Sequence, residues 1–466
     1  MSPQIARIIF FAFIGFLFVC DRKRRSGCSN ALWIPLFWVL ILGSRPFSSW
    51  FGGGVDMETT DDYIEGSPVD RIVFLFLIIA GFIVLKQRQT NWANVFRTNR
   101  WLFVFFAYLG ISSVWSDFPM VSFKRWIKDL GNIIMVLVIL SEKDPVEAVK
   151  TLLLRCCYLL VPLSVLYIKY FPDIGRGYNR WTGEPIAMGV TTAKNMLGIT
   201  VLACWVGIFW HFVDSFDWKS KDKKAMAAYI ALLGLTLWLL ISTNSATSLA
   251  CSILAAGILI GMKLPAVQKR VKYLEAYVIT FILLLMIGQS LFNSGEALAG
   301  TMGRDLTFTG RVDIWKRVLA EDINPLIGTG YYSFWMGDRV DRISEGFYFH
   351  LNEAHNGYIE TYLNSGIIGL ALLLLALYSA SRRIKAELLQ GQQFAKVRLI
   401  FLAVGVVYNL TEAAFNKLSL LWILLLLVVT EYPQPRKARV PASARPSPAG
   451  GGFPKSPVQG EMPAPG

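Results

Sequence analysis

Long apolar segments recur along this chain, and they restrict its possible folds more than any other feature. A helix of about 20 apolar residues spans the hydrocarbon core of a bilayer. The segments lack the alternating pattern of a transmembrane barrel, so helices must satisfy the backbone. We predict an all-α, polytopic integral membrane protein with about twelve to thirteen transmembrane helices. The expected spans are residues 4–20, 31–48, 70–86, 101–117, 121–140, 151–170, 192–213, 226–243, 247–263, 274–292, 357–380, 398–410 and 417–431.

The charge distribution predicts which connections face the cytoplasm. In a chain that is 54% hydrophobic, a net charge of +14 is typical of basic cytoplasmic loops and not of a nucleic-acid surface. The acidic stretch "GGGVDMETTDDYIEGSPVD", from Gly52 to Asp70, contains no Lys or Arg and is expected outside. The basic connections, expected inside, lie at residues 22–25, 86–100, 219–224, 263–272 and 382–398.

The first apolar segment is expected to be retained as a span, because it lacks a small-residue cleavage site and runs directly into "DRKRR". The six cysteines show neither metal-ligand spacing nor a disulfide framework. We divide the chain into N-terminal transmembrane helices (1–117), central transmembrane helices (118–292), a large external loop with short helices (293–356), C-terminal transmembrane helices (357–431) and a disordered cytoplasmic tail (432–466).

The large loop contains "TFTGRVDIWKRVLAEDINPL", which predicts a short helix. Thr309 can cap its start, Asp313 suits its first turn, and Asn324-Pro325 ends the segment. The apolar side, expected on the membrane surface, consists of Val312, Trp315, Val318 and Leu319.

Several cations break the rule that positive charge lies inside. A span that ends at Leu140 must include Lys124, Arg125, Lys128 and Asp129 at its outer end. Other external cations are Arg176 and Arg180 in "FPDIGRGYNRWTGEP", Lys194 beside Asn195 in "TTAKNMLG", and Arg311 in the loop helix. Local pairing, of Arg125 with Asp129 or of Arg311 with Asp313 or Glu360, is one explanation. The other explanation is a single anionic ligand, such as a lipid-linked diphosphate, which would account for all of these external cations at once.

Of the three histidines, His355 is the strongest functional candidate. It begins a helix whose polar residues, Asn356, Glu360 and Asn364, recur at fourfold spacing where apolar residues are expected. The helix N-terminus and the nearby cations predict a neutral imidazole. His211 is expected to be an interfacial residue, and the neighbours of His350 give it no support.

Metal and nucleotide chemistry have little support in the sequence. "VDMETTDD" has carboxylates at metal-like spacing, but acidic loops produce such pairs freely, and we expect no metal or cofactor. Neither "GxxxxGK[ST]" nor "HExxH" occurs. The polar break "LISTNSATSLACS", from Leu240 to Ser252, is either a tight turn or a re-entrant piece that lines the site.

Two motifs together resemble the O-antigen ligase and O-antigen polymerase family. They are "TGRVDIWKRVLAEDINPLIGTGYYSFW" and "NEAHNGYIETYLNSGIIGL". The upstream "RWIKDLGN" and "GVTTAKNMLG" look most like the exopolysaccharide-production branch, and the resemblance covers roughly Ser122 to Ala380.

The resemblance implies a membrane glycosyltransferase with the fold of lipid-dependent relatives. Such proteins lie in the bacterial inner membrane, with the active site facing the periplasm, and act on an undecaprenyl-diphosphate-linked glycan. The acceptor would be a glycan or a lipid, in exopolysaccharide, O-antigen or lipopolysaccharide assembly of the cell envelope. A flippase and a chain-length regulator would be partner proteins.

The resemblance assigns Arg311 and His355 to the diphosphate and catalytic positions, with Glu360 orienting the histidine. His355 would either take a proton from the acceptor or hold the diphosphate. Ligases usually carry an arginine in the turn that here reads "STNSATS". Its absence leaves the second diphosphate cation open among Lys194, Arg180 and Arg125, and favours a polymerase over a ligase.

The remaining expected substrate-binding residues are Asn195, Arg176, Lys128 and Asn356. The competing class is a lipid-linked oligosaccharide flippase. A flippase needs charges along a cavity through the midplane, whereas these cations gather at external helix ends.

Overall fold

A computed structural model describes residues 1–24, 27–51, 67–178, 183–214, 216, 219, 222–273, 277, 280, 309–346 and 351–432. Met1–Tyr432 forms one unit. The region after Tyr432, where we expect a disordered tail, lies outside the described residues, as do His350, Arg180 and the stretch "VDMETTDD".

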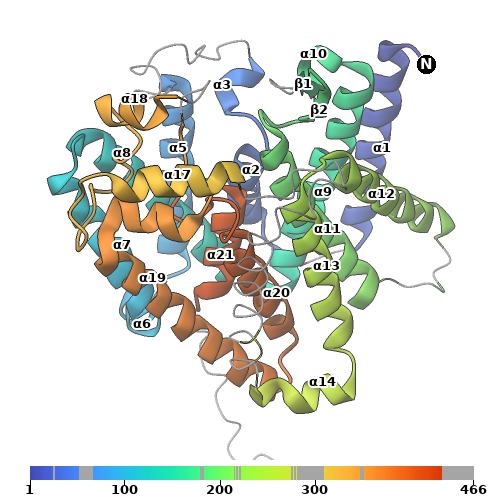
Figure 1. The fold of residues 1–466 in the computed structure, drawn as a ribbon. Coiled ribbons are helices and arrows are strands. Elements are labelled where there is room, and N and C mark those ends of the chain that lie inside the picture. The colour runs from blue at the N-terminus through green and yellow to red at the C-terminus, as the bar shows by residue number, and fades with distance from the viewer. Residues whose placement is uncertain are drawn as a thin grey trace, which may run out of the picture. The chain divides into compact units, whose positions relative to one another are not determined.

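The described chain is helical, with one short pair of strands (Figure 1). The strands β1 (Arg176–Tyr178) and β2 (Pro185–Ala187) pair antiparallel. The all-α, polytopic class predicted from the sequence is confirmed. The helices are α1 (Pro3–Arg24), η1 (Asn30–Leu32), α2 (Trp33–Leu42), α3 (Phe47–Trp50), α5 (Pro68–Gln87), α6 (Trp92–Thr98), α7 (Arg100–Ser112), η2 (Ser113–Trp115), α8 (Pro119–Leu140), α9 (Pro145–Tyr170), α10 (Pro172–Gly175), α11 (Lys194–Asp214), α12 (Lys223–Ser242), α13 (Ala246–Gly261), α14 (Pro265–Arg270), η3 (Val271–Tyr273), α17 (Thr309–Ala320), α18 (Asp338–Ser344), α19 (Gly357–Leu389), α20 (Gln393–Tyr408) and α21 (Leu420–Val429).

Every predicted span except 274–292, which lies largely outside the described residues, coincides with one of these helices. Six of the described helices are long and apolar enough to cross a membrane, and the bent pair formed by α13 and Pro265–Tyr273 would make a seventh. Helices α2, α20 and α21 are shorter than a full span, with 10, 16 and 10 residues. The predicted count of twelve to thirteen is therefore met only in part.

Helix α21 forms the centre of the main core, and Figure 1 shows it surrounded by other helices. All its residues are at most 3% exposed, which explains why the sequence is apolar on every side. Two arginines satisfy its last carbonyls: Arg383 Nη2 donates to Val429 O and Arg398 Nε to Val428 O, each at 2.8 Å. A helix of 10 residues is about 15 Å long, so it ends within the helix assembly.

A second, smaller core belongs to the large loop and the start of α19. Ile314 and Val318 of α17 pack there with Phe334, Ile343 and Leu363. Of the residues expected on the apolar side of α17, Val318 is buried and Leu319 is 53% exposed, and Ile314, which was not among them, is buried as well. The side chain of the expected cap, Thr309, is not described.

Helix α19 has a break at Gly366, which separates its polar first turns from its apolar remainder. Gly366 has a φ of +65°, and a Cβ there would lie 2.2 Å from the carbonyl of Leu326. Gly328, on the facing turn, also has a positive φ, and its Cβ would lie 2.6 Å from Asn364. This close approach fixes the loop segment that follows Asn324 against the break.

Candidate active site

The turn between α20 and α21 packs against the start of α19 and hydrogen-bonds to it. Asn356 caps the helix, because its Oδ1 accepts from the N–H groups of Tyr358 and Ile359 at 3.0 and 3.1 Å. The N–H of Gly357 donates to the carbonyls of Asn409 and Glu412 at 2.8 and 3.1 Å. A Cβ at Gly357 would lie 2.0 Å from Asn409 Oδ1, so only glycine permits this contact.

Glu412, in that turn, binds side chains from three other parts of the chain. Its Oε1 lies 2.8 Å from Arg311 Nη2 and 3.2 Å from Asn195 Nδ2, and its Oε2 lies 3.3 Å from His355 Nδ1. Arg311 also donates to the carbonyl of Thr411. The carboxylate thus connects α17, the N-terminus of α11 and the histidine before α19.

A second carboxylate, Glu353, completes the group. Its Oε1 lies 2.9 Å from His355 Nδ1, and its Oε2 lies 2.6 Å from Lys417 Nζ. We call Arg311, Glu353, His355, Glu412 and Lys417 the Glu412 cluster. With His355 protonated, it contains three cations and two carboxylates, and so carries one net positive charge.

The electrostatics of the cluster contradict the prediction of a neutral His355. Burial lowers the pKa of His355, but hydrogen bonds to Glu353 and Glu412 outweigh burial and raise the pKa to about 9. Burial alone would raise the pKa of Glu353, yet the charge of Lys417 and the bond to His355 hold it far below its usual range. Sequence reasoning counted the cations near the histidine and missed both carboxylates.

Glu360 does not contact the imidazole, contrary to the expected orienting role. It is 6% exposed, and its Oε1 accepts from Trp335 Nε1 at 2.6 Å while its Oε2 accepts from the N–H of Ala354 at 3.1 Å. Glu360 therefore fixes the backbone that precedes His355. Asn364 continues this polar face: its Nδ2 donates to the carbonyl of Glu360, and its Oδ1 accepts from the N–H of Phe334.

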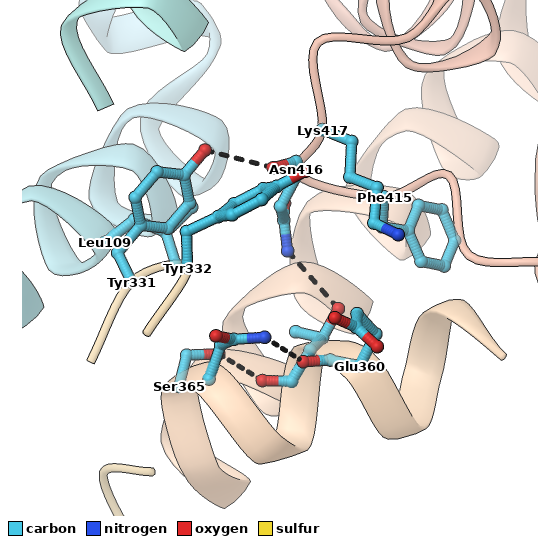
Figure 2. Close-up of a pocket in the computed structure, with 10 residues that line it drawn as sticks. Leu109, Tyr331, Tyr332, Glu360, Ser365, Phe415, Asn416 and Lys417 are labelled. Carbon is cyan, nitrogen blue, oxygen red and sulfur yellow. Dashed lines mark hydrogen bonds between the residues drawn. The ribbon is translucent and has the colours of Figure 1, made fainter. Parts of the chain in front are cut away.

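A small pocket lies beside the cluster, and Lys417 is among the residues that line it (Figure 2). Figure 2 shows Lys417 and Phe415 on one side of it and Glu360 and Ser365 on the other. Tyr331 donates from its hydroxyl to the carbonyl of Asn416 at 3.0 Å, and Asn416 Nδ2 donates to Thr361 Oγ1 at 3.2 Å. These bonds join the loop, the turn before α21 and the first part of α19.

Of the other predicted ligand residues, the structure brings Asn195 of α11 to the cluster. Asn195 binds Glu412 directly, and the half-buried Lys194 precedes it as the first residue of α11. The amide of Asn356 caps α19, and its Nδ2 donates to the carbonyl of Leu410. Both contacts of this side chain are therefore structural. Arg180 lies outside the described residues.

The three remaining cations have contacts elsewhere. Arg125 donates to the carbonyl of Tyr332 at 3.1 Å and lies over its ring, while Lys128 lies 6.0 Å from the ring centre of Phe74. Arg176 donates to the carbonyl of Ile168 at 2.7 Å. Arg125 is thus joined to a residue that lines the pocket, whereas Lys128 and Arg176 are not placed at the Glu412 cluster by any of these contacts.

The local pairs considered from the sequence are replaced by longer-range contacts. Arg311 pairs with Glu412, and neither Asp313 nor Glu360 is its partner in the salt bridge. Asp129 is buried and accepts from Asn132, Trp422 and Tyr331 at 2.8 to 3.0 Å. These contacts tie α8 to α21 and to the large loop.

The "STNSATS" turn lies beside the cluster. Thr247 Oγ1 is 2.9 Å from Thr411 Oγ1, next to Glu412. The N-terminal turns of α11 pack closely against the start of α13, since a Cβ at Gly198 would lie 2.4 Å from Ser248 Oγ. The position where ligases are expected to carry an arginine therefore adjoins the cluster and carries uncharged residues.

The residues that sequence reasoning missed are Glu353, Asn409, Glu412 and Lys417. Three of them lie in "NLTEAAFNKLS", where several polar residues interrupt two apolar segments. That interruption was a usable signal. Glu353 is two residues from His355, which was also visible in the sequence.

The cluster could also be considered as a metal site. Glu353, His355 and Glu412 offer ligand atoms within 4.8 Å of one another. Lys417 and Arg311 already bind the two carboxylates, and their positive charges oppose a cation at the same oxygens. We assign no metal here.

Residues 225–374 match the family model described as O-antigen ligase. Over this segment the chain is similar to the O-antigen ligase family. It includes Arg311, Glu353, His355 and Glu360, and it ends before Glu412. The exopolysaccharide production protein ExoQ of Rhizobium meliloti (strain 1021) is 28% identical over 305 residues, which cover 60% of this chain and 64% of that relative. The match thus spans less than two thirds of the relative, and the resemblance stated from the sequence is confirmed.

Proposed function

We propose that the chain transfers a glycan from undecaprenyl diphosphate to a glycan or lipid acceptor at the periplasmic face of the bacterial inner membrane. The observation that carries the proposal is that Arg311 Nη2 and His355 Nδ1 both lie close to the single carboxylate of Glu412, at 2.8 and 3.3 Å. Two cations on one buried anion form a site that suits phosphate oxygens. The O-antigen ligase segment supports this class of reaction.

In the reaction, the anomeric carbon of the donor sugar loses a diphosphate, which gains negative charge as the bond breaks. Arg311 and His355 would stabilise that charge, and Lys194 at the start of α11 would add to it. With a pKa near 9, His355 holds its proton at neutral pH. Between the two roles open for His355, this favours binding of the diphosphate over acceptance of a proton. Such cations can do the work of a metal, so we propose a metal-independent transfer.

Polymerisation is favoured over ligation to lipid A core. The relative's name refers to exopolysaccharide production, and the "STNSATS" turn carries no arginine beside the cluster. A flippase and a chain-length regulator would then act before and with this protein.

The test uses purified protein in lipid nanodiscs with lipid-linked oligosaccharide from the producing strain. Wild-type protein should convert it to longer chains or to glycosylated acceptor and release undecaprenyl diphosphate, with a chelator present. Arg311→Ala should abolish the conversion. In sealed proteoliposomes, movement of the intact donor across the bilayer without bond cleavage would instead indicate a flippase.

The orientation is tested separately with reporter fusions. A fusion after Ser333 should report the periplasm, and fusions after Gln87 and Ala386 should report the cytoplasm. A cytoplasmic signal at Ser333 would contradict the proposed face.

A further inference from the structure

Glu412 is held in a place where an anionic ligand would compete with it. Its side chain is 10% exposed, whereas its partners Arg311 and His355 are 28% and 30% exposed. The two cations are therefore more accessible to a ligand than the carboxylate that they bind. Under the proposed function, on which this inference rests, the diphosphate binds these same two cations.

Binding of the diphosphate changes the surroundings of Glu412. The guanidinium of Arg311 and the imidazolium of His355 then share their hydrogen bonds with phosphate oxygens, and two ionised phosphates lie nearby. Loss of positive partners and gain of negative neighbours both make a carboxylate accept a proton more readily. Donor binding and activation of the carboxylate are thereby coupled.

We propose that Glu412 is the catalytic base that takes the proton from the acceptor hydroxyl, and that donor binding releases it for this role. The acceptor oxygen forms a bond to the anomeric carbon, the bond from that carbon to the diphosphate oxygen breaks, and its electron pair leaves with the diphosphate. The acceptor proton goes to a carboxylate oxygen of Glu412 and from there to water. Atoms and charge balance without another reactant.

The other carboxylates near the cluster are less suited to this role. Glu353 remains bound to Lys417, which is not a proposed phosphate ligand, and Glu360 is fully engaged by Trp335 and Ala354. His355 already carries a proton. The charged and titratable groups near Glu412 are Arg311 of α17, Glu353 and His355 before α19, and Tyr408 of α20.

The experiment separates binding of the diphosphate from transfer. Glu412→Gln keeps the size of the side chain and removes its charge and basicity. It should bind undecaprenyl diphosphate in nanodiscs about threefold tighter or more, because the competing carboxylate is gone. Its transfer rate should fall on the order of 10²–10⁴-fold. A purely structural role predicts weaker binding and slower transfer together.

Chemical rescue supplies a second readout. In Glu412→Ala, added formate should restore part of the transfer rate, since a small carboxylate can occupy the space and accept the proton. Formate should not accelerate the wild type. The matched control is Glu431→Gln, which removes another glutamate paired with an arginine, Arg383, at the opposite end of α21. It should retain transfer.

The outcomes distinguish the two proposals. If wild-type protein leaves the lipid-linked donor unconverted, the proposed function and this inference both fail. If wild type transfers and Glu412→Gln stays within about threefold of its rate, Glu412 is not the base. The inference also fails if Glu412→Gln loses binding in proportion to transfer and formate restores nothing in Glu412→Ala. Tighter binding with slower transfer and formate rescue supports it.

Discussion

The guanidinium of Arg311 lies 2.8 Å from the carboxylate of Glu412, although 101 residues separate them in the chain. The pair joins α17, in the large loop, to the turn between α20 and α21. Because Arg311 also donates to the carbonyl of Thr411, its planar fork contacts both the backbone and the side chain of that turn. Position 311 therefore requires a side chain with two donors in a fixed arrangement, as in arginine.

Arg311→Lys should reduce transfer on the order of 10²–10³-fold, because lysine keeps the charge but cannot bind two oxygens with a fixed fork. The rate of polymer formation in membranes with matched protein levels measures the effect. Arg317→Lys, on the same helix, is the control, since Arg317 donates to the loop carbonyls of Ile343 and Glu345. Full activity of Arg311→Lys would mean that charge alone suffices.

The raised pKa of His355 predicts a pH dependence of stability. The pKa rises from an ordinary 6.5 to about 9 in the folded protein, so the histidine contributes stability fully below pH 6.5. This contribution is lost as the pH rises through about 9. Thermal unfolding of the purified protein should show a falling midpoint over this range. His355→Gln should remove that decrease, and an unchanged profile in the variant would contradict the assignment.

Removal of one partner from the pair of Lys417 and Glu353 should destabilise the protein. Lys417→Met leaves Glu353 with His355 alone, at an expected cost of roughly 1–3 kcal/mol. The double variant with Glu353→Gln should lose less than the sum of the two single variants, because the residues are in contact. Unfolding midpoints of the four proteins give the coupling. Additive losses would show that the pair contributes nothing of its own.

Gly366→Ala should prevent normal folding of the active-site region. A side chain at a φ of +65°, 2.2 Å from the carbonyl of Leu326, forces the loop away from α19, at a cost of about 2 kcal/mol or more. Gly234→Ala on α12 is the control, because its Cβ would meet nothing within 4 Å. The amount of folded protein in the membrane, followed by size-exclusion chromatography, measures the difference. Equal amounts would contradict the close approach.

The helical class and the positions of the helices could be predicted, because apolar composition over many residues reports burial in lipid or protein directly. The sequence did not show which of these helices are long enough to cross a membrane. Helix α21 reads as a membrane span in the sequence, yet it is short and completely buried by other helices. Hydropathy does not distinguish lipid from a protein interior, since both favour the same side chains.

Two of the five residues of the Glu412 cluster, Arg311 and His355, could also be predicted. Arg311 and His355 stand out because charged residues at the ends of apolar helices are unusual. Glu412 and Lys417 become informative only when the turn after α20 is known to lie against α19, a contact that depends on Asn409 and Gly357. The error about the charge of His355 follows from this gap, because a pKa depends on every nearby charge and not only on those within the same motif.

The burial of α21 has a consequence for how the protein is made. The turn that supplies Glu412 and Lys417 lies between α20 and α21, so those two residues leave the ribosome after most of the helices. Until α21 enters the space among its neighbours and meets Arg383 and Arg398, the earlier helices surround an unfilled centre. We therefore expect the Glu412 cluster to be completed late in biogenesis, because a nascent chain that stops before Thr411 lacks two of its five residues, Glu412 and Lys417.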